Sequence, residues 1–138
     1  MARFQTTRKV EWGDCDPAGI IFYPRYYHFM DGAFQEFAAS LGFSQRSLRE
    51  EHGLVGTPLV DTGCRFLSPL THGDETAIDV TVEHLGASSL RLAYAFNCGG
   101  RRTAEGFEAR VFARESGGAI AKTEIPQEIR AAIEAAMT

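Results

Sequence analysis

Two aspartates lie close together near the amino terminus, on either side of a cysteine and directly before a turn. The segment reads Asp14-Cys15-Asp16-Pro17-Ala18-Gly19. A carboxylate at such a position could attack a carbonyl carbon as a nucleophile or take a proton from water as a general base. Alternatively, both aspartates only form the turn, because aspartate readily hydrogen-bonds its own backbone there. Cys15 is a weaker candidate nucleophile, since two neighbouring carboxylates oppose formation of its thiolate.

A long helix is predicted directly after this turn, from about Tyr23 to Leu41. Its apolar residues recur every three or four positions and form one broad stripe, so the helix should lie against a sheet. The stripe consists of Phe22, Tyr23, Tyr26, Tyr27, Met30, Ala33, Phe34, Phe37, Ala38 and Leu41. Pro24 suits the first helical position, where its missing N–H costs nothing, and Gly42 suits the cap after the last turn.

The start of this helix could also stabilise a developing negative charge. The first N–H groups of a helix have no partner within it, and the helix dipole places partial positive charge at the same end. These groups are expected in the backbone between Gly19 and Tyr23. The alternative is that they are merely solvated or locally capped.

The rest of the chain has an α+β pattern, with one short helix and then a series of antiparallel strands. Ser44 can cap a helix that runs through Glu51, and Ser47 with Glu50 forms a possible capping-box pair. The strands are expected at Phe4 to Trp12, Leu59 to Phe66, Thr76 to Leu85, Ser88 to Cys98, Thr103 to Ala113 and Ala119 to Ile125, with an amphipathic helix after Pro126. All of residues 1–138 should form a single domain.

Composition argues against several classes of protein. With 44% hydrophobic and 23% charged residues, the chain has the make-up of a soluble globular protein. The net charge of −4 argues against a nucleic-acid-binding protein. No apolar run approaches the roughly 20 residues of a membrane span, and no signal peptide is evident, so a cytoplasmic location is expected. Three distant cysteines and four scattered histidines suggest neither a disulfide framework nor a zinc site, and no metal or cofactor is expected.

The segment from Glu11 to Tyr26, EWGDCDPAGIIFYPRY, resembles the signature of the 4-hydroxybenzoyl-CoA thioesterase family of hot-dog fold enzymes. The GLVGTP stretch at residues 53–58 and the strand-rich remainder also match that family's layout. The resemblance implies a curled antiparallel sheet wrapped around one long central helix. It also implies hydrolysis of an acyl-CoA thioester to a free acid and CoA.

The same resemblance implies roles for individual residues. Asp16 would be the catalytic carboxylate, as nucleophile or as general base, while Asp14 would be structural or would tune the local charge. The backbone amide of Tyr23 would polarise the thioester carbonyl. Gly19 and Ile20 would complete this oxyanion and substrate-binding region.

Two details bear on the substrate. The aryl-CoA branch of the family has a proline at the position of Pro24, which favours an aryl-CoA such as 4-hydroxybenzoyl-CoA. The basic cluster that contacts the CoA phosphates in that branch is absent near residues 86–88. Arg91, Arg101 and Arg102 are therefore the phosphate candidates, unless another subunit supplies the contact. Two alternatives remain open: a thioesterase for acyl-carrier-protein substrates of a biosynthetic pathway, and a non-catalytic acyl-binding hot-dog module.

We also expect a homodimer, or a homotetramer built as a dimer of dimers. A single curled sheet leaves the backbone groups of its edge strands unpaired, and one sheet covers the apolar helix incompletely. Pairing two copies edge to edge would correct both. The resemblance implies that the active site then lies at the subunit interface.

Overall fold

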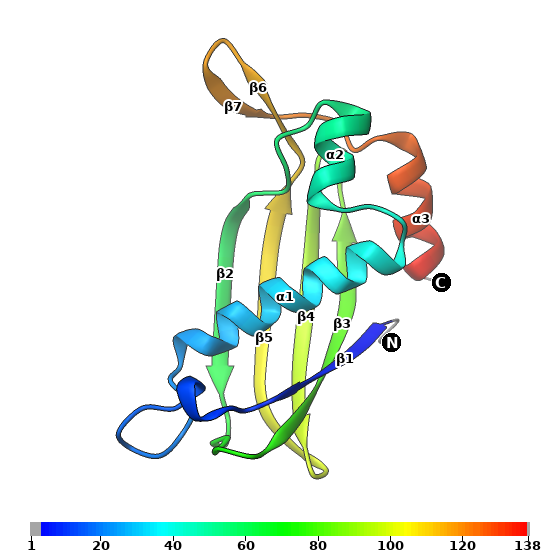
Figure 1. Ribbon diagram of the computed structural model, residues 1–138. Coiled ribbons are helices and arrows are strands. Elements are labelled where there is room, and N and C mark those ends of the chain that lie inside the picture. The colour runs from blue at the N-terminus through cyan, green and yellow to red at the C-terminus, as the bar shows by residue number, and fades with distance from the viewer. Residues whose placement is uncertain (1–3, 138) are drawn as a thin grey trace.

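The computed structural model describes residues 4–137, and its central feature is the predicted long helix, α1 (Pro24–Ser40). This helix crosses one face of a curled five-stranded antiparallel sheet (Figure 1). The other elements are β1 (Phe4–Lys9), η1 (Trp12–Asp14), α2 (Gln45–His52), β2 (Leu59–Phe66), β3 (Glu75–Leu85), β4 (Ser89–Cys98), β5 (Arg101–Val111), β6 (Ala113–Ser116), β7 (Ala119–Lys122) and α3 (Gln127–Met137). None of the helices in this part of the chain is both long and apolar enough to cross a membrane.

The sheet has the strand order β1-β3-β4-β5-β2, with every neighbouring pair antiparallel. β1 and β2 are therefore its edge strands. Side chains alternate between the two faces, so in β4 the buried Leu92, Tyr94 and Phe96 face the interior while the residues between them face the other way. Phe96 meets Tyr26 of α1 with ring centroids 5.0 Å apart, which identifies the helix side of the sheet.

The apolar stripe of α1 forms the core together with this face. Pro24 occupies the first turn as predicted, and Gly42 after the helix has a φ of 94°. The buried residues of the helix are Tyr26, Phe29, Met30, Ala33, Phe34, Phe37 and Ala38. Phe22 and Tyr23 were predicted to join the stripe but are 46% and 59% exposed, because they precede the first helical turn. α1 lies so close to the sheet that a Cβ at Gly106 would overlap the sulfur of Met30.

A polar network is buried between α1 and the sheet. Glu108 of β5, only 1% exposed, accepts hydrogen bonds from the Tyr94 hydroxyl at 2.5 Å and from Arg110 Nε at 3.0 Å. Arg110 also donates to Asp31 of α1 at 2.8 Å and to the Thr57 carbonyl at 2.9 Å. The guanidinium group therefore ties β5 to the helix and to the loop before β2.

The prediction of a strand from Phe4 to Trp12 was wrong at its end, since β1 stops at Lys9. Hydrogen bonds between Glu11 and Asp14 cause the difference. The Glu11 N–H donates to Asp14 Oδ2 at 2.9 Å, and the Asp14 N–H donates to the Glu11 carbonyl at 3.0 Å. The backbone therefore turns before the acidic segment and leaves Trp12 78% exposed.

Other boundaries also differ from the predictions. The capping box of α2 consists of Ser44 and Ser47, while Glu50 accepts a hydrogen bond from Arg46 instead. The strand predicted from Thr103 begins two residues earlier, at Arg101, and ends at Val111 instead of Ala113. The last predicted strand is short and pairs with β6 in a separate hairpin that projects from one end of the molecule (Figure 1).

Candidate active site

The predicted acidic turn is present and holds Asp16 at its first position. The Gly19 N–H donates to the Asp16 carbonyl at 2.9 Å, and Gly19 has a φ of 83°, which glycine adopts without strain. The Ala18 N–H donates to Asp16 Oδ1 at 2.9 Å. Among residues 4–137, no donor contacts the other carboxylate oxygen of Asp16. The side chain is thus oriented by the turn and keeps one oxygen available for chemistry.

Short backbone contacts fix the turn in place. The Asp16 N–H donates to the Ile20 carbonyl at 3.0 Å, and the Phe22 N–H donates to the Asp14 carbonyl at 2.8 Å. The Ile21 N–H donates to the Leu70 carbonyl at 2.8 Å, which attaches the turn to the segment before β3. A loop bonded at these points should hold its carboxylate in one position.

Asp14 is held differently from Asp16. Besides its contact with the Glu11 N–H, its Oδ1 lies 3.5 Å from Arg25 Nε, and its side chain is only 16% exposed. These contacts shape the end of β1 and the entry into α1.

Tyr23 precedes the first residue of α1 and has a free backbone amide. Pro24 has no N–H, and the next two amides already donate: Arg25 to the Phe22 carbonyl at 2.9 Å and Tyr26 to the Tyr23 carbonyl at 3.1 Å. Within residues 4–137 the Tyr23 N–H has no acceptor. This amide is therefore the donor left at the helix start for a bound oxygen atom.

Two pockets open beside the turn. The first, of about 420 Å³, is mainly apolar and is lined by Ile20, Ile21, Tyr23, Tyr26, Phe66, Leu67, Ser68 and Pro69. The rings of Tyr26 and Phe66 lie 5.3 Å apart in its wall. Burial raises the pKa of the Tyr26 hydroxyl, so this group stays protonated at neutral pH. The pocket offers aromatic surface to a flat apolar ligand, with the Tyr23 end of the helix at its edge.

The second pocket, of about 400 Å³, contains the acidic side chain itself. It is lined by Trp12, Cys15, Asp16, Pro17, Gly19 and His72. The rings of Trp12 and His72 meet edge to face, with centroids 5.7 Å apart. His72 was not singled out in the sequence because it lies far along the chain from Asp16 and has no spacing motif. Only the attachment of residues 70–71 to the turn brings it there.

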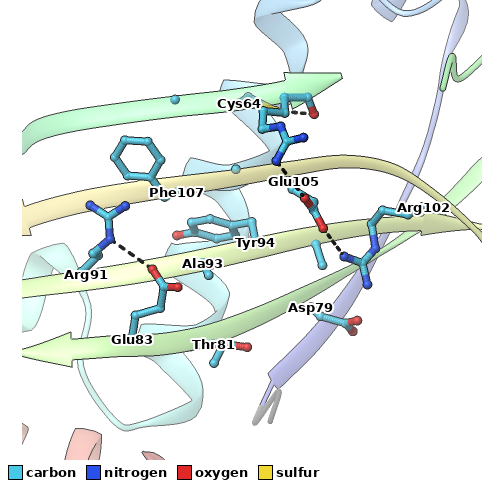
Figure 2. A pocket seen from close by; sticks show the side chains of 14 residues that line it. Cys64, Asp79, Thr81, Glu83, Arg91, Ala93, Tyr94, Arg102, Glu105 and Phe107 are labelled. Atoms are coloured by element: carbon cyan, nitrogen blue, oxygen red, sulfur yellow. Dashed lines mark hydrogen bonds and ion pairs between the residues drawn. The ribbon is translucent and has the colours of Figure 1, made fainter. Parts of the chain in front are cut away.

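The three candidate arginines do not gather at one place. Figure 2 shows Arg91 and Arg102 on the sheet, where Arg91 Nε lies 3.1 Å from Glu83 and Arg102 Nη1 lies 2.7 Å from Glu105. Arg91 alternates with the buried residues of β4, so it faces away from α1. Both arginines line a third pocket, of about 410 Å³.

Arg101 lies elsewhere, next to the apolar pocket. Its Nη1 donates to the Pro69 carbonyl at 2.9 Å and to the Ser68 hydroxyl, and both acceptor residues line that pocket. Its Nη2 lies 3.8 Å from Asp74. Of the three candidates, Arg101 is the one that the fold brings to the region of the Asp16 turn.

One group in the described part of the chain could ligate a metal ion. Side-chain atoms of Glu51, His52 and Glu128 lie within 4.8 Å of one another, and His52 Nε2 is 2.9 Å from Glu128 Oε1. The group joins α2 to α3, at the other end of α1 from the acidic turn (Figure 1). It therefore takes no part in the chemistry of the Asp16 turn.

Known proteins that are similar to this chain include hydrolases of CoA thioesters. A 4-hydroxybenzoyl-CoA thioesterase of Pseudomonas sp. (strain CBS-3) is 30% identical over 93% of this chain and 96% of its own. Its solved structure superposes with a TM-score of 0.88, at 27% identity, and the match covers 94% of this chain and 97% of that one.

Two further similar proteins are also named as hydrolases of CoA esters. The solved structure of a gentisyl-coenzyme A thioesterase gives a TM-score of 0.83, at 35% identity, over 94% of this chain and 99% of that one. A 1,4-dihydroxy-2-naphthoyl-CoA hydrolase of Thermosynechococcus vestitus is 32% identical over 70% of this chain and 66% of its own. The family model of the thioesterase-like superfamily matches residues 10–133. The predicted hot-dog fold is therefore confirmed, and the chain belongs to the thioesterase-like superfamily.

Proposed function

We propose that this protein is an acyl-CoA thioesterase whose acyl group is a small aromatic acid such as 4-hydroxybenzoate. The observation that carries the proposal is the combination of an oriented Asp16 carboxylate with the free Tyr23 amide at the start of α1. The relatives named above act, by their names, on CoA thioesters of hydroxylated aromatic acids. The aromatic wall of the apolar pocket offers a matching surface for such a ring.

The chemistry of thioester hydrolysis requires a group that attacks or activates water, and a donor for the oxyanion. Asp16 can attack the carbonyl carbon and form a mixed anhydride, or it can take a proton from the attacking water. In both routes the carbonyl oxygen becomes negative, and the Tyr23 N–H with the positive end of α1 stabilises it. Ile20 and Gly19 would form the adjoining wall of this site.

Arg101 is the proposed contact for the negatively charged part of the substrate. It lies beside the apolar pocket, whereas Arg91 and Arg102 line a pocket on the face of the sheet that points away from α1 and are paired with Glu83 and Glu105. Binding a phosphate requires Arg101 to exchange its ion pair with Asp74, which is long at 3.8 Å and partly exposed, for a contact with the phosphate.

We further propose that the working form is at least a homodimer, paired through β2. This edge strand and the residue after it expose apolar side chains, with Leu59 at 44%, Val60 at 64%, Phe66 at 50% and Leu67 at 46%. Around a twofold axis, antiparallel pairing puts the start of one β2 beside the end of the other. The partner's Leu59 and Val60 would then cover the pocket wall that Phe66 and Leu67 form. The site would thus be completed by the second copy.

Asp16→Asn is the direct test of the proposed function. The substitution keeps the size of the side chain and its acceptor oxygen for the Ala18 N–H, but it removes the carboxylate. Hydrolysis of 4-hydroxybenzoyl-CoA should fall at least ~100-fold, the lower range for loss of a general base. Thermal stability and binding of the ester should change little.

Asp14→Asn is the matched control and should lose much less turnover, because the Asp14 carboxylate is already engaged by the Glu11 N–H and by Arg25. Near-normal turnover by the Asp16→Asn variant, with deamidation excluded by mass spectrometry, would refute the assignment.

The same assay with an acyl-carrier-protein thioester separates the two substrate classes, CoA esters and carrier-protein esters. A protein that binds both esters and hydrolyses neither would be an acyl-binding module.

A further inference from the structure

We propose that His72 is the general base for the second half of the reaction, in which water releases the acyl group from Asp16. The inference rests on the proposed function and on the route in which Asp16 is the nucleophile. It assigns a chemical role to a histidine that shares the pocket of the acidic turn but belongs to a distant part of the sequence.

The pocket brings the two side chains together around a space that water can enter. The pocket has a volume of about 400 Å³. Because a water molecule takes up roughly 30 Å³, the pocket has room for part of the substrate and several water molecules. The imidazole of His72 is exposed on one wall and packs against the edge of Trp12, while Asp16 and Cys15 contribute to the same lining. A water molecule between Asp16 and His72 would therefore lie inside the site.

The loop that carries His72 is fixed on both sides. Before it, the Leu70 carbonyl accepts from the Ile21 N–H of the acidic turn at 2.8 Å. After it, the Gly73 N–H donates to the Val10 carbonyl at 2.9 Å, and Asp74 Oδ2 accepts from the Thr71 N–H at 2.8 Å. Both attachments lead to the segment that contains Asp16, so the distance between the two side chains should vary little.

The reaction leaves a defined task for a base. In the first step an Asp16 oxygen bonds to the carbonyl carbon, the C–S bond breaks, and its electron pair leaves with the CoA thiolate. In the second step water bonds to the carbonyl carbon of the substrate's acyl group in the resulting anhydride, the bond from that carbon to the Asp16 oxygen breaks, and one proton of the water must be removed. Asp16 cannot accept that proton, because its carboxylate is bonded to the acyl group. His72 takes the proton, Asp16 leaves as a carboxylate, and the imidazolium then protonates the thiolate or loses the proton to solvent.

The other residues of the pocket cannot perform this task. Of the side chains that line it, only those of Cys15, Asp16 and His72 exchange protons readily. The Cys15 thiol donates to the Glu11 carbonyl oxygen at 3.7 Å, so its proton is engaged with the backbone. Histidine is the side chain most often used as a general base near neutral pH. Among the described residues that line this pocket, His72 is therefore the one that can act as the general base in the second step.

The test is rapid-quench kinetics of His72→Gln with 4-hydroxybenzoyl-CoA. The variant should release about one equivalent of CoA per active site at the wild-type rate, because acylation needs no imidazole. Steady-state turnover should then be ~100-fold slower, as expected for loss of a general base. Mass spectrometry of the quenched variant should find the acyl group on the peptide that contains Asp16. Imidazole added to His72→Ala should restore part of the turnover.

His28→Gln is the matched control, because His28 is an exposed histidine of α1 that does not line this pocket. It should behave as the wild type. Unchanged turnover of His72→Gln, or a slower first step with no acyl-enzyme, would overturn the role of His72 alone. If instead the wild type hydrolyses no thioester, or Asp16→Asn remains active, the proposed function itself fails and this inference falls with it.

Discussion

Replacing Glu108 by glutamine should destabilise the fold strongly, although this residue lies outside the proposed active site. Its carboxylate accepts from the Tyr94 hydroxyl at 2.5 Å and from Arg110 at 3.0 Å, and 1% of the residue is exposed. Burial and the neighbouring Glu108 charge raise the pKa of the Tyr94 hydroxyl, so Tyr94 stays a donor. For Arg110, burial acts to lower the pKa, but the contacts with Glu108 and Asp31 outweigh it and raise the pKa, so the group stays charged.

The size of the effect follows from what the substitution leaves behind. Glutamine is nearly the same size and keeps one acceptor oxygen, so no large cavity forms and one hydrogen bond can survive. The buried Arg110 charge, however, loses its buried partner and keeps Asp31, whose side chain is 55% exposed. Removing one member of a buried ion pair typically costs about 3–5 kcal/mol. We expect a loss of about 3 kcal/mol, the low end of that range, because of the retained hydrogen bond.

Urea unfolding followed by fluorescence measures this loss directly. Protein concentration must be held constant, because the proposed dimer would make the measured stability depend on it. Glu105→Gln is the matched control: its ion pair with Arg102 is exposed, so it should cost at most about 1 kcal/mol. A Glu108→Gln variant within 1 kcal/mol of the wild type would refute the reasoning, since the network would then contribute no more than a surface pair.

Three further predictions concern substrate binding, a thiol and assembly. Arg101→Ala should raise the KM for a CoA ester and reduce its dependence on salt with little change in kcat, whereas Arg91→Ala and Arg102→Ala should leave the KM unchanged; equal KM values for all three would exclude Arg101. Burial raises the pKa of the Cys64 thiol to about 11 from an ordinary value of 9.0, so at pH 8 it should react far more slowly with a maleimide in the folded protein than in urea, and equal rates would contradict this. Light scattering should find a dimer that Val60→Asp dissociates with loss of activity, whereas a fully active monomer would exclude the β2 interface.

The sequence was sufficient to predict the elements that position the site. Aromatic residues recur along α1 at helical spacing, and apolar residues alternate along β3 and β4. Both patterns arise because one face of each element is buried, so they can be recognised in the sequence. The turn of Asp16 was also predictable, because proline and glycine restrict the backbone locally. The end of β1 was not predictable, because it depends on which of several acidic side chains accepts a hydrogen bond from the Glu11 N–H.

The residues around Asp16 were only partly predictable. Whether an arginine is free to bind phosphate depends on the partners that the fold gives it. Arg91 is paired with Glu83 of the neighbouring strand β3, and Arg102 with Glu105 of its own strand, β5. His72 enters the site only through backbone contacts between residues 20–21 and 70–71. Contacts between segments distant in the chain leave no periodic pattern, so a single sequence cannot indicate them.

The free amide of Tyr23 shows how local stability and chemistry arise from the same residues. A helix start normally exposes several N–H groups, which compete for solvent or for side-chain caps. Here Pro24 removes one donor, and the Phe22 and Tyr23 carbonyls accept from Arg25 and Tyr26. Within residues 4–137, the Tyr23 N–H is therefore the amide left without an acceptor at the positive end of the helix. It lies next to the turn in which the Ala18 N–H donates to the Asp16 carboxylate. The segment that begins α1 thus positions both the proposed attacking group, Asp16, and the proposed oxyanion donor, Tyr23, and variation in the surrounding pockets could change the acyl group without altering either.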